Sequence, residues 1–202
     1  MDQIAFELLT KDWQVQDQMD SCLPSCMINI TNDLQTDFQG FKIKFKAKEM
    51  KSICDYRPHL GSSPDVVVKN LNNEFKRRGA PFKCAESNGT INTIDALRNI
   101  ILDKDKSFPL ISLSQDYFEE IGLSIEGRNP FDHVIAVLAI EDGKIWFHDP
   151  YKPFAMRSSR VKTFNNHLPY VTMLKYWKET QSPNWVMWVE RVAGTLDRWL
   201  VK

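Results

Sequence analysis

Residues 133–150 limit the possible folds more than any other stretch, because they predict an antiparallel β-hairpin. Two segments rich in apolar residues, 133–140 and 145–150, flank the turn 141–144. This turn contains Asp142-Gly143. Asp-Gly between two apolar runs is the strongest short signal for a hairpin. The sequence therefore predicts an antiparallel sheet in the later part of the chain.

Helical patterns dominate the earlier part of the chain. A helix from residue 64 to 78 is expected to begin after Ser63 as N-cap, with Pro64 in its first turn, and to stop at Gly79. Further helices are expected within 1–15, over 23 to about 36, over 90–102 and over 171–180, and strands around Cys84, over 108–113 and over 185–189. Helices first and a sheet later indicate the α+β class.

Residues 41–48 alternate apolar side chains with four lysines, a period-two pattern that predicts a half-buried strand with one basic face. Two interpretations stay open for the lysines: an edge strand protected from pairing, or a docking face for an acidic partner. Irregular structure is expected over 49–63, long connections over 115–132 and 151–168, and a tail with helical spacing at the end.

The composition is that of one globular domain spanning 1–202. Hydrophobic residues make up 43% and charged residues 26%, and 26 basic residues balance 26 acidic ones, so no nucleic-acid or anionic membrane partner is expected. The longest apolar run, 134–140, is too short to span a bilayer, and the start of the chain does not resemble a secretory signal. With four cysteines that do not resemble a disulfide framework, we expect a cytoplasmic protein with reduced thiols.

Cys22 is the first candidate for chemistry, because it stands where the helix from residue 23 begins. A thiol at a helix N-terminus feels the positive end of the helix dipole, which favours the nucleophilic thiolate. A nucleophile also needs a base, a group that orients the base, and a donor for the oxyanion.

The hairpin supplies candidates for the base and its orienting group. His133 opens the first strand and Asp149 ends the second, so both belong to the open end of the hairpin. A two-residue turn places Asp149 opposite Ala136, which leaves roughly 10 Å along the strand to His133. A bulge, strand twist or longer turn must close this gap. His133 would then take the Cys22 proton and Asp149 would orient it, while the side-chain amide of Gln16 is the candidate oxyanion donor.

Other side chains compete for these roles. His148 is a rival base, but its side chain should point to the opposite face of the sheet from Asp149. Gln14 and Gln18 compete with Gln16, and only the spacing to Cys22 favours Gln16. Cys26, one helical turn after Cys22, is interpreted as a core residue. Cys54, His59 and Cys84 could join Cys22 and Cys26 as zinc ligands, but no C-x2-C pair is present and the spacings are irregular, so neither metal nor cofactor is expected.

Taken together, this arrangement resembles the papain-like cysteine peptidases. Within that superfamily it is most similar to the bacteriocin-processing, double-glycine peptidases, whose pattern is roughly Q-x5-C-G-x-A-C followed by a strand-opening His and an Asp-Pro sixteen residues later. Cys22 and Cys26 match the two cysteine positions, and His133 and Asp149 have that separation. Ser25 replaces the alanine, and Leu23 stands where the family keeps glycine.

The resemblance implies a papain-like fold, with a thioester at Cys22, His133 as base, Asp149 as orienting group and Gln16 in the oxyanion hole. It implies a polypeptide substrate, with a small-residue or Gly-Gly cleavage site as one option, and makes 41–63 an insertion. The same machinery runs isopeptide cleavage, side-chain amide hydrolysis and acyl transfer. A different hypothesis, encouraged by Leu23, is an inactive papain-like interaction module that uses the lysine face of 41–48.

Overall fold

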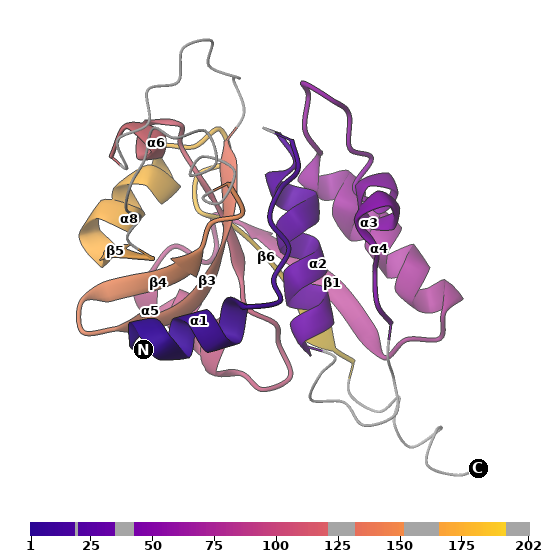
Figure 1. Ribbon diagram of the computed structural model, residues 1–202, viewed down its shortest axis with the longest axis horizontal. Coiled ribbons are helices and arrows are strands. Elements are labelled where there is room, and N and C mark those ends of the chain that lie inside the picture. The colour runs from indigo at the N-terminus through magenta and orange to yellow at the C-terminus, as the bar shows by residue number, and fades with distance from the viewer. Residues whose placement is uncertain (19, 35–42, 121–131, 152–165, 193–202) are drawn as a thin grey trace.

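The computed structural model describes residues 1–202 except 19, 35–42, 121–131, 152–165 and 193–202 (Figure 1). The described part contains seven helices and six strands. In chain order these are α1 (Gln3–Thr10), α2 (Cys22–Leu34), α3 (Ala47–Ile53), α4 (Pro64–Arg77), β1 (Phe82–Asn88), α5 (Ile94–Leu102), β2 (Leu110–Leu113), α6 (Asp116–Glu120), β3 (His133–Glu141), β4 (Lys144–His148), β5 (His167–Pro169), α8 (Tyr170–Lys178) and β6 (Trp185–Arg191).

The six strands form one sheet in the order β1-β6-β2-β3-β4-β5, and every neighbouring pair is antiparallel. The last strand, β6, lies between β1 and β2, so the C-terminal part of the described chain joins the early strand to the later ones (Figure 1). Helices combined with an antiparallel sheet confirm the α+β class.

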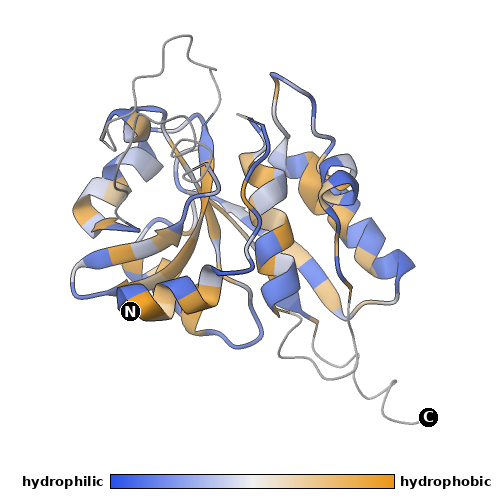
Figure 2. Cartoon of the chain, viewed as in Figure 1, coloured by the Kyte–Doolittle hydropathy of each residue, from blue (hydrophilic) through white to orange (hydrophobic). Residues whose placement is uncertain are grey.

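Two apolar cores lie on the two faces of this sheet. One core joins side chains of α1, α2, α3 and α4 to the sheet, and the other joins α5, α6 and α8 to it. Because β3 contributes to both cores, seven of its nine residues are buried, and Figure 2 shows hydrophobic colours along the central strands. This explains why 133–140 is apolar without alternation.

Helix α2 packs against β3 and is buried along most of its length. Met27 and Ile30 have no exposed surface, and even the polar side chain of Asn29 is buried. Asn29 accepts a hydrogen bond from the backbone N–H of Gln14 and donates one to its carbonyl. The segment that leads to Cys22 is thereby fixed alongside the helix.

Helix α4 confirms the sequence-based prediction for 64–78. Ser63 is its N-cap, Pro64 is in its first turn, and Gly79 after its end has a φ of +65°. The buried side chains are spaced four residues apart, at Val67, Leu71 and Phe75. The helix after Thr90 is also present, although it begins later, at Ile94, with Thr93 as its cap.

The predicted hairpin is confirmed, and it contains a β-bulge that changes its register. Glu141 pairs with Lys144 around the two-residue turn, but the regular pairing shifts between Val137 and Ala139. Beyond this bulge Ala136 pairs with His148 instead of with Asp149. The bulge therefore brings Asp149 one residue closer to His133 than an unbroken ladder would.

The strand predicted over 41–48 is wrong. Residues 43–46 belong to no strand, and Ala47 begins helix α3. The alternation nevertheless corresponds to burial, because Ile43 and Phe45 are buried whereas Lys44 is exposed. Packing of the Phe45 ring on Phe75 of α4, at 6.2 Å between ring centroids, replaces a strand partner. Residues 41 and 42 lie outside the described part.

Two of the three predicted irregular regions also need correction. Helix α3 occupies the start of 49–63, and the short helix α6 occupies 116–120 within the expected connection 115–132. Short helices of five to seven residues contain too few turns to produce a clear 3.6-residue period in the sequence. Most of 151–168 and the tail from 193 lie outside the described residues, and 167–169 form the short strand β5.

The hairpin turn predicts the effect of one glycine substitution. Asp142 and Gly143 have φ values of +50° and +73°, a pair typical of a type I′ turn. A Cβ at position 143 would meet only the Tyr170 ring, at an ordinary 3.7 Å. Gly143→Ala should therefore lower the free energy of unfolding by about 1 kcal/mol through backbone strain alone. Urea denaturation measures the change.

Asp142→Asn is the matched control, because asparagine tolerates the left-handed conformation that Asp142 already adopts. Its free energy of unfolding should stay within about 0.5 kcal/mol of the wild type. Equal stability of Gly143→Ala and Asp142→Asn would show that the turn does not impose its backbone geometry.

Candidate active site

The open end of the hairpin brings His133 and Asp149 into direct contact. Nε2 of His133 lies 2.7 Å from Oδ1 of Asp149, and both side chains are almost completely buried, at 4% and 1% exposure. Without the bulge in β3, Asp149 would stand opposite Ala136. The bulge thus contributes directly to this contact.

Asp149 accepts hydrogen bonds from three donors. Besides His133, the hydroxyl of Tyr117 donates to Oδ2 at 2.9 Å, and the backbone N–H of Tyr151 donates to Oδ1 at 2.9 Å. A buried carboxylate is stable only when such donors replace its lost hydration. The three bonds also fix the direction in which Asp149 faces His133.

The charges of His133 and Asp149 stabilise each other. Burial opposes the charged form of His133, but attraction to the Asp149 carboxylate and hydrogen bonds to Asp149 and Cys22 outweigh it and raise the pKa of His133 to about 10. Burial alone would raise the pKa of Asp149, but His133 and the hydrogen-bond donors hold it below its ordinary value. At neutral pH the two residues form an ion pair.

Three aromatic rings surround the His133 imidazole. Tyr117 stacks parallel to it at 6.0 Å, the Phe118 ring is 4.8 Å away, and Tyr151 meets it edge-on at 6.2 Å between centroids. The sequence analysis missed these rings, because it treated 115–132 and 151–168 as connections. For two of the three, the available signal was the aromatic pair at 117–118, which follows shortly after the buried strand that ends at Leu113.

Cys22 is the first residue of α2, and it lines the same cleft as His133. The residue is 8% exposed, and its interaction with His133 is one of the causes that raise the pKa of His133. Since Nε2 of the imidazole faces Asp149, the other ring nitrogen is the one left for Cys22. The three predicted site residues, Cys22, His133 and Asp149, therefore lie in one region at the cleft.

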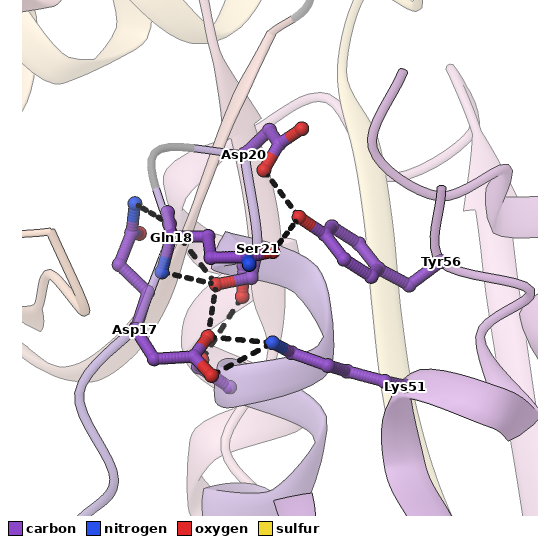
Figure 3. A network of polar contacts seen from close by, with 8 residues as sticks. Asp17, Gln18, Asp20, Ser21, Lys51 and Tyr56 are labelled. Atoms are coloured by element: carbon purple, nitrogen blue, oxygen red, sulfur yellow. Dashed lines mark hydrogen bonds and ion pairs between the residues drawn. The ribbon is translucent and has the colours of Figure 1, made fainter. Parts of the chain in front are cut away.

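A polar network supports the segment that enters α2 (Figure 3). Asp17 forms an ion pair with Lys51 of α3, at 2.7 Å, and accepts a hydrogen bond from Ser21 at 3.1 Å. The hydroxyl of Tyr56 lies within hydrogen-bond distance of the side-chain oxygens of both Gln18 and Asp20, and can donate to either one. The residues just before Cys22 are thus tied to α3 and to the loop after it.

Gln16 is buried next to both parts of the site. Its backbone N–H donates to the carbonyl of Pro150, which follows Asp149, at 3.0 Å. One N–H of its side-chain amide donates to the carbonyl of Gln18 at 2.9 Å. Gln16 does not appear among the described residues that line the cleft, so its role as oxyanion donor stays a prediction.

The rival side chains occupy other positions. His148 packs against the Trp13 ring, at 5.0 Å between ring centroids. Trp13 belongs to the core on the α2 face of the sheet. Cys26 is fully buried and its thiol donates to the Val134 carbonyl at 3.5 Å, and burial raises its pKa well above the ordinary value. Burial likewise raises the pKa values of the thiols of Cys54 and Cys84.

An open cleft of about 200 Å³ reaches the Cys22 and His133 side chains. Leu60 and Gly61 line one part of it, and Ser182 lines another. Leu23, which stands at the family's glycine position, is 3% exposed and also contributes to the wall. A ligand in this cleft would lie against the thiol.

The described residues contain no group of three or more His, Cys, Asp or Glu side chains arranged to hold a metal ion. Within the same residues, no helix has the length and apolar character that crossing a bilayer requires. All four cysteines are free thiols.

Comparison with protein-family models finds no match, and comparison with curated proteins finds none either. A thiol and an imidazole that line one cleft, with the imidazole held by a buried carboxylate, can carry out nucleophilic attack with proton transfer.

The ion pair predicts a pH-dependent difference in stability. His133 has an ordinary pKa of 6.5 and a folded-state pKa of about 10, so its stabilising contribution is complete below 6.5 and is lost as the pH rises toward 10. The unfolding free energy of wild type minus that of His133→Gln should fall across this range. Urea denaturation at a series of pH values measures it, and parallel curves for the two proteins would contradict the ion pair.

Tyr117→Phe removes one donor from the buried carboxylate of Asp149. Because a hydrogen bond to a buried charged group is lost, the free energy of unfolding should fall by about 1–3 kcal/mol. Chemical denaturation near neutral pH tests this. Tyr170→Phe, at a tyrosine that is 38% exposed, is the control and should change stability by less than about 0.5 kcal/mol. Similar losses in both variants would contradict the role of the Tyr117 hydroxyl.

Proposed function

We propose that this protein is a cysteine peptidase that cleaves peptide or isopeptide bonds through a thioester at Cys22. The observation that carries the proposal is that Cys22 and His133 line the same cleft while the His133 imidazole contacts the buried carboxylate of Asp149. A buried ion pair aimed at a thiol in an open cleft is more than packing requires. Ionisable groups whose pKa values are strongly shifted and that line a cleft are typical of functional sites.

The first half of the proposed reaction forms the acyl-enzyme. The charged imidazole of His133 stabilises a thiolate at Cys22, which attacks the carbonyl carbon of the substrate. The C–N bond then breaks, and His133 gives its proton to the leaving amine nitrogen. The backbone N–H of Cys22, in the first turn of α2, would donate to the oxyanion.

The second half releases the acid product. A water molecule gives its proton to His133 and attacks the thioester carbon, and the Cys22 sulfur departs as the thiolate. The carboxylate of Asp149 keeps the imidazole oriented during both transfers and stabilises its positive charge. A peptide would require a groove along the cleft, whereas isopeptide or side-chain amide substrates would use the same three residues.

A papain-like fold, with a single domain over 1–202 and 41–63 as an insertion, is part of this proposal. A candidate nucleophile at the start of a helix that packs on an antiparallel sheet supports it. The candidate base and its orienting group lie at the open end of the β3–β4 hairpin of that sheet. Reduced buried cysteines agree with a cytoplasmic location. The exposed Lys44, Lys46 and Lys48 would attract an acidic partner if the protein acts as a binding module instead.

Alkylation by a thiol-directed peptidyl epoxide tests the proposed function. Cys22 should be labelled stoichiometrically, because it lines the cleft, while the buried Cys54 and Cys84 should react slowly. His133→Gln should slow labelling of Cys22 by roughly 100-fold, because the variant lacks the charged imidazole that stabilises the reactive thiolate. Peptide mapping by mass spectrometry gives the rate at each thiol.

His148→Gln is the matched control for this experiment. His148 is also a buried histidine beside Asp149 in sequence, but it faces the opposite core. Its substitution should leave the labelling rate of Cys22 within a few fold. Labelling of Cys22 that is no faster than that of Cys54, or equally fast in His133→Gln, would overturn the proposal.

A further inference from the structure

The polar side chains that line the cleft fall into two groups. The carboxylates of Asp20 and Asp132 already accept hydrogen bonds from the protein. Asp20 accepts from the hydroxyl of Tyr56 and from the backbone N–H of His59, and Asp132 accepts from the backbone N–H of Gln181 at 2.9 Å. These two carboxylates anchor the walls of the cleft.

Two serine hydroxyls in the same cleft are different. The side-chain oxygens of Ser112 and Ser62 are buried and have no hydrogen-bond partner among the described residues. Ser112 is only 5% exposed and lies on β2, opposite Val134 of β3. A hydroxyl buried without a partner loses its hydration at a cost that a bound ligand can remove.

The surroundings of Ser112 are apolar. Leu23, Val134 and Trp185 line the cleft with it, and all three belong to the core on the α2 face of the sheet. The one polar group of the Trp185 side chain, its indole N–H, already donates to Glu86 at 3.0 Å. A side chain that enters the cleft therefore meets apolar walls and a hydroxyl that can both donate and accept.

We propose that this cleft is a side-chain subsite that selects an uncharged substrate residue with a hydrogen-bonding tip, such as a carboxamide or hydroxyl, and that Ser112 determines this selectivity. The inference rests on the proposed function and adds its substrate class. Acidic side chains are disfavoured, because the carboxylates of Asp20 and Asp132 line the same cleft. Apolar side chains of equal shape would leave the Ser112 hydroxyl unpaired.

Peptides that differ only in this respect provide the test. Two pairs of fluorogenic peptides are compared at each position before the cleaved bond. One pair carries glutamine or methionine at that position, and the other carries threonine or valine. Wild type should favour glutamine over methionine, and threonine over valine, at one position. In Ser112→Ala this preference in kcat/KM should fall by roughly 10-fold, which corresponds to the loss of one buried hydrogen bond.

Ser114→Ala is the matched control. Ser114 is also a buried serine without a partner for its hydroxyl among the described residues, but it does not line the cleft. Its variant should keep the wild-type preference. An unchanged preference in Ser112→Ala, or a preference for lysine or arginine that survives in that variant, would assign selectivity to the anchored carboxylates and overturn the inference.

A binding experiment separates failure of the subsite from failure of the chemistry. Capped tripeptide amides of the same sequences are titrated against Cys22→Ala, with and without Ser112→Ala, by calorimetry. A glutamine preference that depends on Ser112 supports the subsite even if wild type shows no turnover, in which case only the peptidase proposal fails. Turnover in wild type combined with binding that ignores Ser112 overturns the subsite alone.

Discussion

The buried pair of His133 and Asp149 depends on several separate parts of the chain. Removing two charges from water costs several kcal/mol for each ion, and their mutual attraction offsets this only when further hydrogen bonds complete the site. Here Tyr117 of α6 and the backbone of Tyr151 supply those bonds. The pair therefore requires β3, β4, α6 and the chain after β4 to be in place together.

The residues next to the reactive groups also shape the cleft. Asp20 lies two positions before Cys22 and holds the loop of Tyr56 and His59, whereas Asp132 directly precedes His133 and holds the loop at Gln181. Each short segment thus delivers one reactive side chain and anchors one wall. A movement of either wall of the cleft would therefore also shift the Cys22 thiol or the His133 imidazole.

The elements that could be predicted are those whose signal is local. The Asp142-Gly143 turn and the Ser63-Pro64 helix start follow from backbone preferences of single residues. The α2 helix follows from its apolar period. Residues 41–48 failed because alternating burial does not require a strand partner, and Phe45 found a ring of α4 instead. Local patterns indicate which side chains are buried better than they indicate what covers them.

In the candidate site, the residue types and their order pointed to Cys22, His133 and Asp149, but the geometry that joins them could not be read from the chain. The bulge between Val137 and Ala139 lies within an unbroken apolar run, where an extra residue leaves no trace in the pattern. The aromatic pair at 117–118 was visible in the sequence, but the hydrogen bond from Tyr117 to Asp149 was not, since it depends on where α6 lies relative to the end of β4.

Ser112 shows why chemistry is easier to infer from a sequence than selectivity. Within the run 110–113 it resembles any small residue of a buried strand, and its backbone is placed between two neighbouring strands in the sheet. Only the tertiary structure reveals that its hydroxyl is left without a partner in the described residues and that it lines the cleft beside Cys22. An unpaired buried hydroxyl costs about 1–3 kcal/mol. A ligand that bonds to it recovers that free energy and an apolar ligand does not, so the same cost becomes the source of discrimination.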